Sequence, residues 1–68
     1  MKVKLNGAPR ELTDGASVAE AVAATGAPAG ARGLAVAVDG EVVPRGEWES
    51  TTIAAGQSVE VLHAVQGG

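Results

Sequence analysis

Apolar and polar residues alternate in three segments of the chain, and this period of two predicts strands that bury one face. The segments are residues 2–6, 34–38 and 58–65. In the last of them Val59 and Val61 share the face that we expect to be buried. The pattern therefore predicts a sheet with a valine-rich inner face.

Two turn signals join these strands to shorter partners. Asn6-Gly7 and Asp39-Gly40 both suit the positive φ angles of a type I′ hairpin turn. We expect return strands over about residues 9–13 and 41–43, with Leu12 as the best core candidate of the first. The chain therefore contains two predicted hairpins.

One helix is predicted between the hairpins. Ser17 and Glu20 have the spacing of a capping box, so the helix should begin at about Val18. Gly26 fits the left-handed position that ends a helix. The predicted buried stripe is thin and consists of Val18, Ala21, Val22 and Thr25.

Two irregular connections complete the pattern. Residues 27–33 are rich in Gly and Ala, and residues 45–57 are expected to form turns or short 3₁₀ structure. Trp48 lies in the second connection. Because so large an apolar side chain is seldom left exposed, we expect Trp48 to cover the edge of the core.

The order of hairpin, helix, hairpin, irregular crossing and final strand predicts an α+β fold. One helix should lie across one face of a mixed sheet of about five strands, which is the ubiquitin-like β-grasp arrangement. Its first and last strands lie parallel at the centre of the sheet. We expect a single domain over residues 1–68, with a flexible C-terminal tail at residues 66–68 that projects from the final central strand.

Composition narrows the classes of function. The chain has no Cys and a single His, His63, so it has no thiol nucleophile and too few ligands for a metal site. A net charge of −3 and the absence of Phe and Tyr disfavour nucleic-acid binding. With no signal-peptide pattern or membrane-spanning run, we expect a cytoplasmic protein that has no membrane partner. Because no His or carboxylate spacing resembles an acid/base pair, we also expect no catalytic residue.

The side of the sheet opposite the valines is a possible docking surface. By strand parity Leu62 and Glu60 fall on it, together with Ala35 and Ala37. If the helix covers the valine face, this second face is open and mildly apolar. Arg45 is a further candidate contact. The alternatives are a scattered exposed Leu and an Arg that is solvated or paired locally.

Charge is unevenly distributed along the chain. From residue 34 onward, Arg45 opposes five acidic residues. A partner that grips this half would offer basic residues, which mainly speed encounter and fix orientation. Ordinary solubility is the alternative explanation.

The sequence stops at Gly67-Gly68, directly after the last strand pattern. Neither glycine has a Cβ, so the segment can extend and thread a slot that is too narrow for side chains. Enzymes that activate a protein's own carboxyl group need such access. A frayed end in a glycine-rich chain is the alternative.

Several segments together resemble the thiamine-biosynthesis sulfur carrier family, ThiS, over nearly the whole chain. The most specific are the Val-Val-Pro-Arg run followed by a Trp, and the Ala-Val-Gln-Gly-Gly end. The glycine-rich connection and the alanine-rich helix depart from what we expect of that family. The segments that carry the resemblance are Asn6–Gly7, Pro9–Leu12, Val36–Arg45, Trp48, Val59–Val61 and Ala64–Gly68.

The resemblance implies a protein co-substrate rather than an enzyme. An E1-like adenylating enzyme would use ATP to activate the Gly68 carboxylate, and a persulfide-bearing desulfurase or rhodanese-type protein would supply sulfur. The resulting thiocarboxylate would donate sulfur to a thiazole synthase in thiamine thiazole biosynthesis. Gly67, Gln66 and Val65 would thread the partners' channels. We expect no bound cofactor and a monomer when the chain is isolated.

Three alternatives stay open at this point. Within the same chemistry, the carrier could serve molybdopterin, cysteine or a thio-containing secondary metabolite. From a different class, the chain could be a non-conjugating β-grasp binding module with an inert tail. An isopeptide bond to a lysine is the third alternative. A neighbouring gene for a thiazole synthase would favour thiamine.

Overall fold

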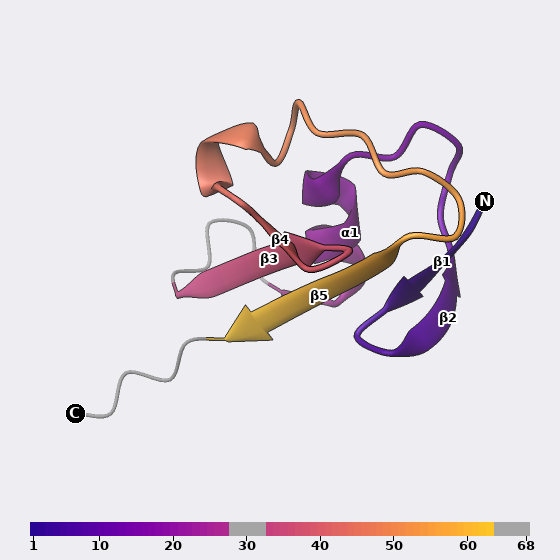
Figure 1. Cartoon of the computed structure of the whole chain (residues 1–68), viewed down its shortest axis with the longest axis horizontal. Helices are drawn as coiled ribbons and strands as arrows, with labels where there is room; N and C mark the ends of the chain where they lie inside the picture. Colours follow the sequence, from indigo (N-terminus) through magenta and orange to yellow (C-terminus); the bar gives the residue numbers. More distant parts are fainter. Residues whose placement is uncertain (28–32, 64–68) are drawn as a thin grey trace.

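The computed structural model describes residues 1–27 and 33–63, and within these ranges five strands form one mixed sheet (Figure 1). The strand order is β2-β1-β5-β3-β4, with β1 and β5 parallel and the other neighbours antiparallel. This topology confirms the predicted β-grasp fold. The elements are β1 (Lys2–Leu5), β2 (Ala8–Glu11), α1 (Val18–Ala24), β3 (Leu34–Val38), β4 (Glu41–Val43), η1 (Arg45–Glu47) and β5 (Ser58–His63).

Both predicted hairpin turns are present, with φ angles of 52° and 82° at Asn6 and Gly7 and of 50° and 86° at Asp39 and Gly40. The first return strand is shorter than predicted and ends at Glu11. The chain leaves the sheet there to reach the helix. Leu12, the predicted core candidate, follows the strand and is half-buried against the core.

The capping box that starts α1 forms as predicted. The Ser17 hydroxyl accepts a hydrogen bond from the Glu20 amide at 3.2 Å, and the Glu20 carboxylate accepts one from the Ser17 amide at 3.0 Å. Two further amides of the first turn donate to the 45–57 connection: Val18 to the Thr51 carbonyl and Ala19 to the Trp48 carbonyl. A helix of seven residues is marginal alone, so these contacts fix where it lies.

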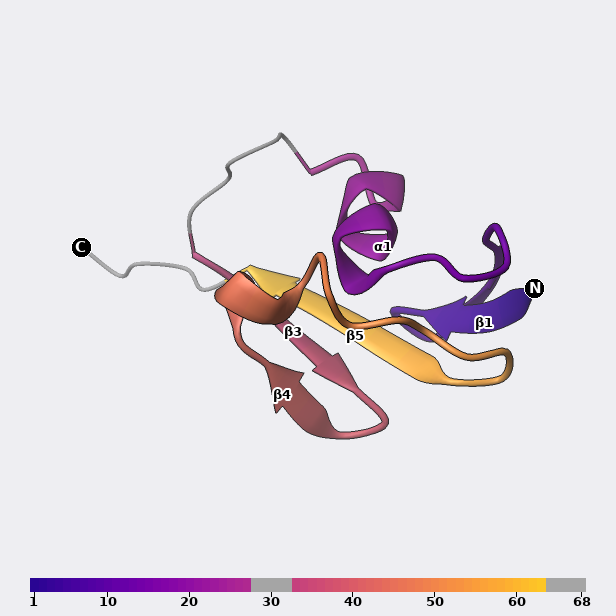
Figure 2. The ribbon, with the colours of Figure 1, turned by 90° about the horizontal axis from the view of Figure 1, so that it is seen from above.

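α1 covers one face of the sheet, and the 45–57 connection passes along the same side (Figure 2). Thr25 is exposed, so its predicted place in the buried stripe is wrong. It is the C-cap, and its hydroxyl donates to the Val22 carbonyl at 2.6 Å. The buried core consists of Val3, Leu5, Val18, Ala21, Val22, Val36, Trp48, Ile53 and Val59.

Trp48 closes the core at its β4 side, as predicted. Its side chain is buried, and its indole N–H donates to the Val43 carbonyl at 2.8 Å. The indole therefore buries its rings without leaving its one polar group unpaired.

The amino terminus ties the first hairpin to the loop before α1. The Met1 ammonium donates to the Leu12 carbonyl at 2.6 Å and lies 3.1 Å from an oxygen of Asp14 and 3.5 Å from one of Glu11. The hydrogen bond to Asp14 is the main cause that raises the pKa of this ammonium above its ordinary value; partial desolvation opposes it.

Two predictions extend outside the described residues: the 27–33 connection, of which 28–32 are not described, and the final strand beyond His63. Within the described ranges, no helix has the length and hydropathy needed to cross a membrane.

Candidate functional site

The predicted reactive terminus and its lead, Gly68, Gly67, Gln66 and Val65, lie outside the described residues. The strand that leads to them is described. Lys4 of β1 donates to the carbonyl of Gln57, just before β5, at 3.0 Å, and the amide of Asn6, just after β1, donates to the Val59 carbonyl at 2.9 Å. On its other side β5 pairs with β3. The strand before the terminus is therefore held by neighbours on both sides at its start.

The sheet face opposite α1, called the open face below, brings together the side chains predicted to dock a partner. Ala35 pairs with Leu62 and Ala37 pairs with Glu60 in the β3–β5 ladder, so these four residues share one face. Leu62 is 60% exposed. The register confirms this placement, while docking by these residues stays a prediction.

The open face has an apolar half and a charged half. Lys2 and Lys4 of β1 lie on the same face, with Glu11 paired opposite Lys2 and Glu60 on the neighbouring β5. Charges of both signs alternate there, so they offset one another. Glu41 pairs with Val38, which points toward the core side of the sheet. The acidity of the second half is thus not concentrated on the open face.

Arg45 does not join the open face. Arg45 is the first residue of η1, and its guanidinium carbon lies 5.2 Å from the centroid of the Trp48 ring. Trp48 belongs to the core on the helix side of the sheet. A cation over an indole is attracted by the electron-rich ring face. Arg45 therefore lies beside Trp48 and not in the β3–β5 ladder with Leu62, and its contact with a partner stays a prediction.

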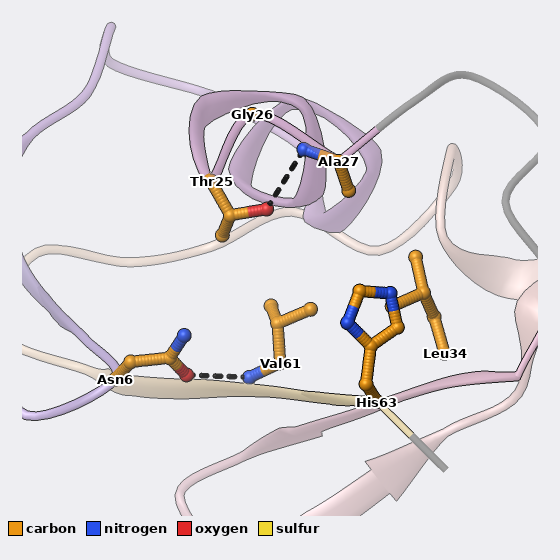
Figure 3. A pocket seen from close by; sticks show the side chains of 7 residues that line it. All are labelled: Asn6, Thr25, Gly26, Ala27, Leu34, Val61 and His63. Atoms are coloured by element: carbon orange, nitrogen blue, oxygen red, sulfur yellow. Dashed lines mark hydrogen bonds between the residues drawn. The ribbon is translucent and has the colours of Figure 1, made fainter. Parts of the chain in front are cut away.

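A hollow of about 310 Å³ lies on the helix side, where β5 approaches its end (Figure 3). The His63 ring points into it from the strand, and the turn after α1 borders it from the other side. Among the described residues, no three His or acidic side chains group together to hold a metal ion. The residues that line the hollow are Asn6, Thr25, Gly26, Ala27, Leu34, Val61 and His63.

Comparison with known families matches this chain to the model of the ThiS family over residues 3–68. The chain belongs to the ThiS family. The match begins in β1 and extends through the diglycine, so it includes both the described fold and the predicted reactive end.

Two solved structures are similar to this ThiS-family chain. A crystal structure of a thiamine biosynthesis protein (ThiS) from Geobacter metallireducens is 31% identical, with all of both chains covered and a TM-score of 0.81. A solution structure of a thiamine biosynthesis protein from the same organism is 30% identical, covers all of this chain and 88% of that one, and has a TM-score of 0.77. No curated protein matches.

One residue on the open face of this ThiS-family protein was missed by the sequence reasoning. Val42 of β4 is 75% exposed and pairs with Ala37, beside the pair of Ala35 and Leu62. The signal was present, because the two-residue turn at Asp39-Gly40 fixes the register and therefore the face of Val42. Val42, Ala35, Ala37 and Leu62 form one apolar surface, called the apolar patch below.

Proposed function

We propose that this chain is a sulfur carrier whose Gly68 carboxylate is converted to a thiocarboxylate that donates sulfur in the biosynthesis of the thiamine thiazole. The observation that carries the proposal is the ThiS-family match, which extends to Gly68. The likeness to two solved structures described as thiamine biosynthesis proteins, over the whole length of this chain, supports the pathway.

The chemistry is supplied by partners, with this chain as their protein substrate. A carboxylate oxygen of Gly68 attacks the α-phosphorus of ATP in an E1-like enzyme, and pyrophosphate leaves. A persulfide of a desulfurase or rhodanese-type protein then attacks the acyl-adenylate and expels AMP. A thiol reductant then cleaves the resulting acyl disulfide and is itself oxidised to a disulfide, which releases the donor's thiol and leaves the thiocarboxylate that a thiazole synthase consumes.

In this proposal the apolar patch docks the adenylating enzyme. Leu62 and Val42 are the two large apolar side chains among the described residues that are mainly exposed. They flank the small side chains of Ala35 and Ala37, so a partner's apolar side chains can approach the sheet closely between them. Leu62 also lies on the strand that leads to the tail, so docking there brings the terminus to the same partner.

The test is chemical and uses the full chain with ATP, the adenylating enzyme of its own source, a sulfur donor and a thiol reductant that is removed before alkylation. Because the chain has no Cys, alkylation by iodoacetamide after the reaction reports a new sulfur on this chain. Mass analysis of a C-terminal fragment must place that sulfur on Gly68, because oxidation of Met1 adds nearly the same mass as exchange of oxygen for sulfur. A chain that lacks Gly68 is the control.

The outcomes separate the proposal from its alternatives. The expected result is ATP-dependent alkylation at Gly68 that no longer occurs when thiazole synthase and its substrates act on the chain before iodoacetamide is added. A thiocarboxylate that only another acceptor enzyme consumes would assign the carrier to another pathway. An unreactive terminus, with partner function intact in the chain that lacks Gly68, would support the non-conjugating binding module.

A further inference from the structure

β5 is an interior strand over its first half and an edge strand over its second half. Its odd-numbered residues turn their backbone groups toward β1, as the bonds accepted by the Gln57 and Val59 carbonyls indicate. β1 ends at Leu5, and the chain then turns away at Asn6-Gly7. In Figure 1 the β1–β2 hairpin lies beside the start of β5, and beyond it β3 is the neighbour on the other side.

Asn6 extends the ladder after β1 has ended: its amide donates to the Val59 carbonyl, and its side chain adds one further hydrogen bond. Its side-chain oxygen accepts from the Val61 amide at 2.8 Å, in the place that the next peptide of β1 would occupy (Figure 3). The next groups on that side are the Val61 carbonyl and the His63 amide. Within residues 1–27 and 33–63, neither has a hydrogen-bond partner. We call this pair of groups the free half-edge.

The hollow lies directly above the free half-edge, on the helix side of β5 (Figure 3). Two of its polar groups already have partners: the Thr25 hydroxyl donates to the Val22 carbonyl and accepts from the Ala27 amide, and the Asn6 oxygen holds Val61. Its lining contains no carboxylate and no ammonium. At about 310 Å³ the hollow is small for a cofactor site and suits one or two apolar side chains.

We propose that an extended, uncharged segment of the adenylating partner pairs with the free half-edge and inserts an apolar side chain into the hollow. The partner's identity rests on the proposed function above. Strand addition supplies affinity through backbone hydrogen bonds and specificity through a side-chain pocket, and both parts are present here. The free half-edge ends at His63, where the chain continues to the predicted tail, so a partner that takes the tail also passes this edge.

This contact differs from docking on the open face. The apolar patch presents side chains on one side of the sheet, whereas the free half-edge presents a backbone donor and acceptor in the plane of the sheet. Together they would hold β5 from two directions, which fixes both the position and the rotation of the strand that delivers the terminus.

Hydrogen exchange of single amides tests the proposal on the wild-type protein. In the free protein, the His63 amide should exchange rapidly and the Leu62 amide, which faces β3, should exchange slowly. In the complex with the adenylating enzyme, exchange at His63 should slow roughly tenfold or more while Leu62 stays slow. The same sample is alkylated with iodoacetamide after reaction, so thiocarboxylate formation is measured separately.

A pair of variants tests the hollow. Ala27→Trp fills it from the turn after α1, and Ala23→Trp puts the same side chain on an exposed helix position. We expect the first variant to bind the adenylating enzyme roughly tenfold more weakly and the second to bind like wild type. Circular dichroism checks that both are folded. If Ala27→Trp does not fold, the His63 exchange measurement on wild type decides the matter alone.

Each other result would overturn the inference. His63 that stays unprotected in a complex that forms thiocarboxylate would leave the proposed function intact and remove the strand pairing. Protection in the free protein would mean that the chain covers its own edge, or, if it grows with protein concentration, that a second copy covers it. Failure of the enzyme to bind or modify the wild-type chain would remove the proposed function and this contact together.

Discussion

The helix side of the sheet and the apolar half of the open face are built from similar small and medium apolar residues, yet they differ in what covers them. On the helix side, Val3, Val36 and Val59 are 2%, 1% and 0% exposed. On the open face, Leu62 and Val42 are 60% and 75% exposed. The core thus lies on one side of the sheet, and the large apolar side chains of the other side are mainly in water.

The largest difference in stability between the two faces should come from Val59→Ala on the helix side of the sheet, called the covered face below. Removing two buried methyl groups from the central strand should lower the free energy of unfolding by about 2–3 kcal/mol. Urea unfolding followed by tryptophan fluorescence measures this through Trp48, the single indole. A loss under about 0.5 kcal/mol would mean that the core does not depend on this face.

Leu62→Ala on the open face should leave stability nearly unchanged and weaken binding to the partner. The free energy of unfolding should change by less than about 0.5 kcal/mol, because most of the side chain is already in water. Binding to the adenylating enzyme should weaken about tenfold, since the patch loses one of its two large side chains. Isothermal titration checks this, with Glu49→Ala, an exposed position in the 45–57 connection, as the control. Equal binding by Leu62→Ala and wild type would remove the patch from docking.

The contrast between the faces was largely predictable, and its exceptions have physical causes. Strand parity assigns Leu62 and Val59 to opposite faces because side chains alternate strictly along a strand. Parity gives no information about Arg45, which lies in a 3₁₀ turn where local packing against an indole decides its position. Strand parity would have placed Val42 correctly had the register of the second hairpin been followed through.

Long-range backbone partners could not be predicted from local patterns. Asn6 was assigned correctly to a turn, but its hydrogen bond to Val61 joins residues 55 positions apart. Likewise, the Ser17 cap was predicted, whereas the bonds from the first helical turn to the Thr51 and Trp48 carbonyls depend on how the 45–57 connection is placed. The free half-edge follows from such contacts, so it emerges only from the structure.

Ser17→Ala should lower the free energy of unfolding by destabilising α1, the helix that covers one face of the sheet. The change removes the acceptor for the Glu20 amide at the start of α1, and loss of an N-cap side chain costs about 1 kcal/mol. The midpoint of urea unfolding should fall accordingly, and Ser17→Thr, which keeps a hydroxyl, should recover most of the loss. If both variants unfold alike, the capping bond does not contribute and the helix is held by packing alone.

The smallest expected effect is a pH dependence at the amino terminus, beside the first hairpin. The pKa of the Met1 ammonium is raised in the folded chain, chiefly by its hydrogen bond to Asp14, so its contribution to stability is present below the ordinary value of about 8. That contribution is lost as the pH rises through the raised pKa. The urea midpoint of wild type should therefore fall between about pH 7 and about pH 10.

Asp14→Asn isolates the contribution of this ammonium from every other source of pH dependence. The variant keeps the shape of the side chain and removes the carboxylate that does most to raise the pKa. Its midpoint should fall less than that of wild type over the same interval, because its ammonium gains less on folding. Equal falls in the two proteins would assign the pH dependence to groups other than the Met1 ammonium and leave the Met1 contacts without a measurable part in holding the hairpin.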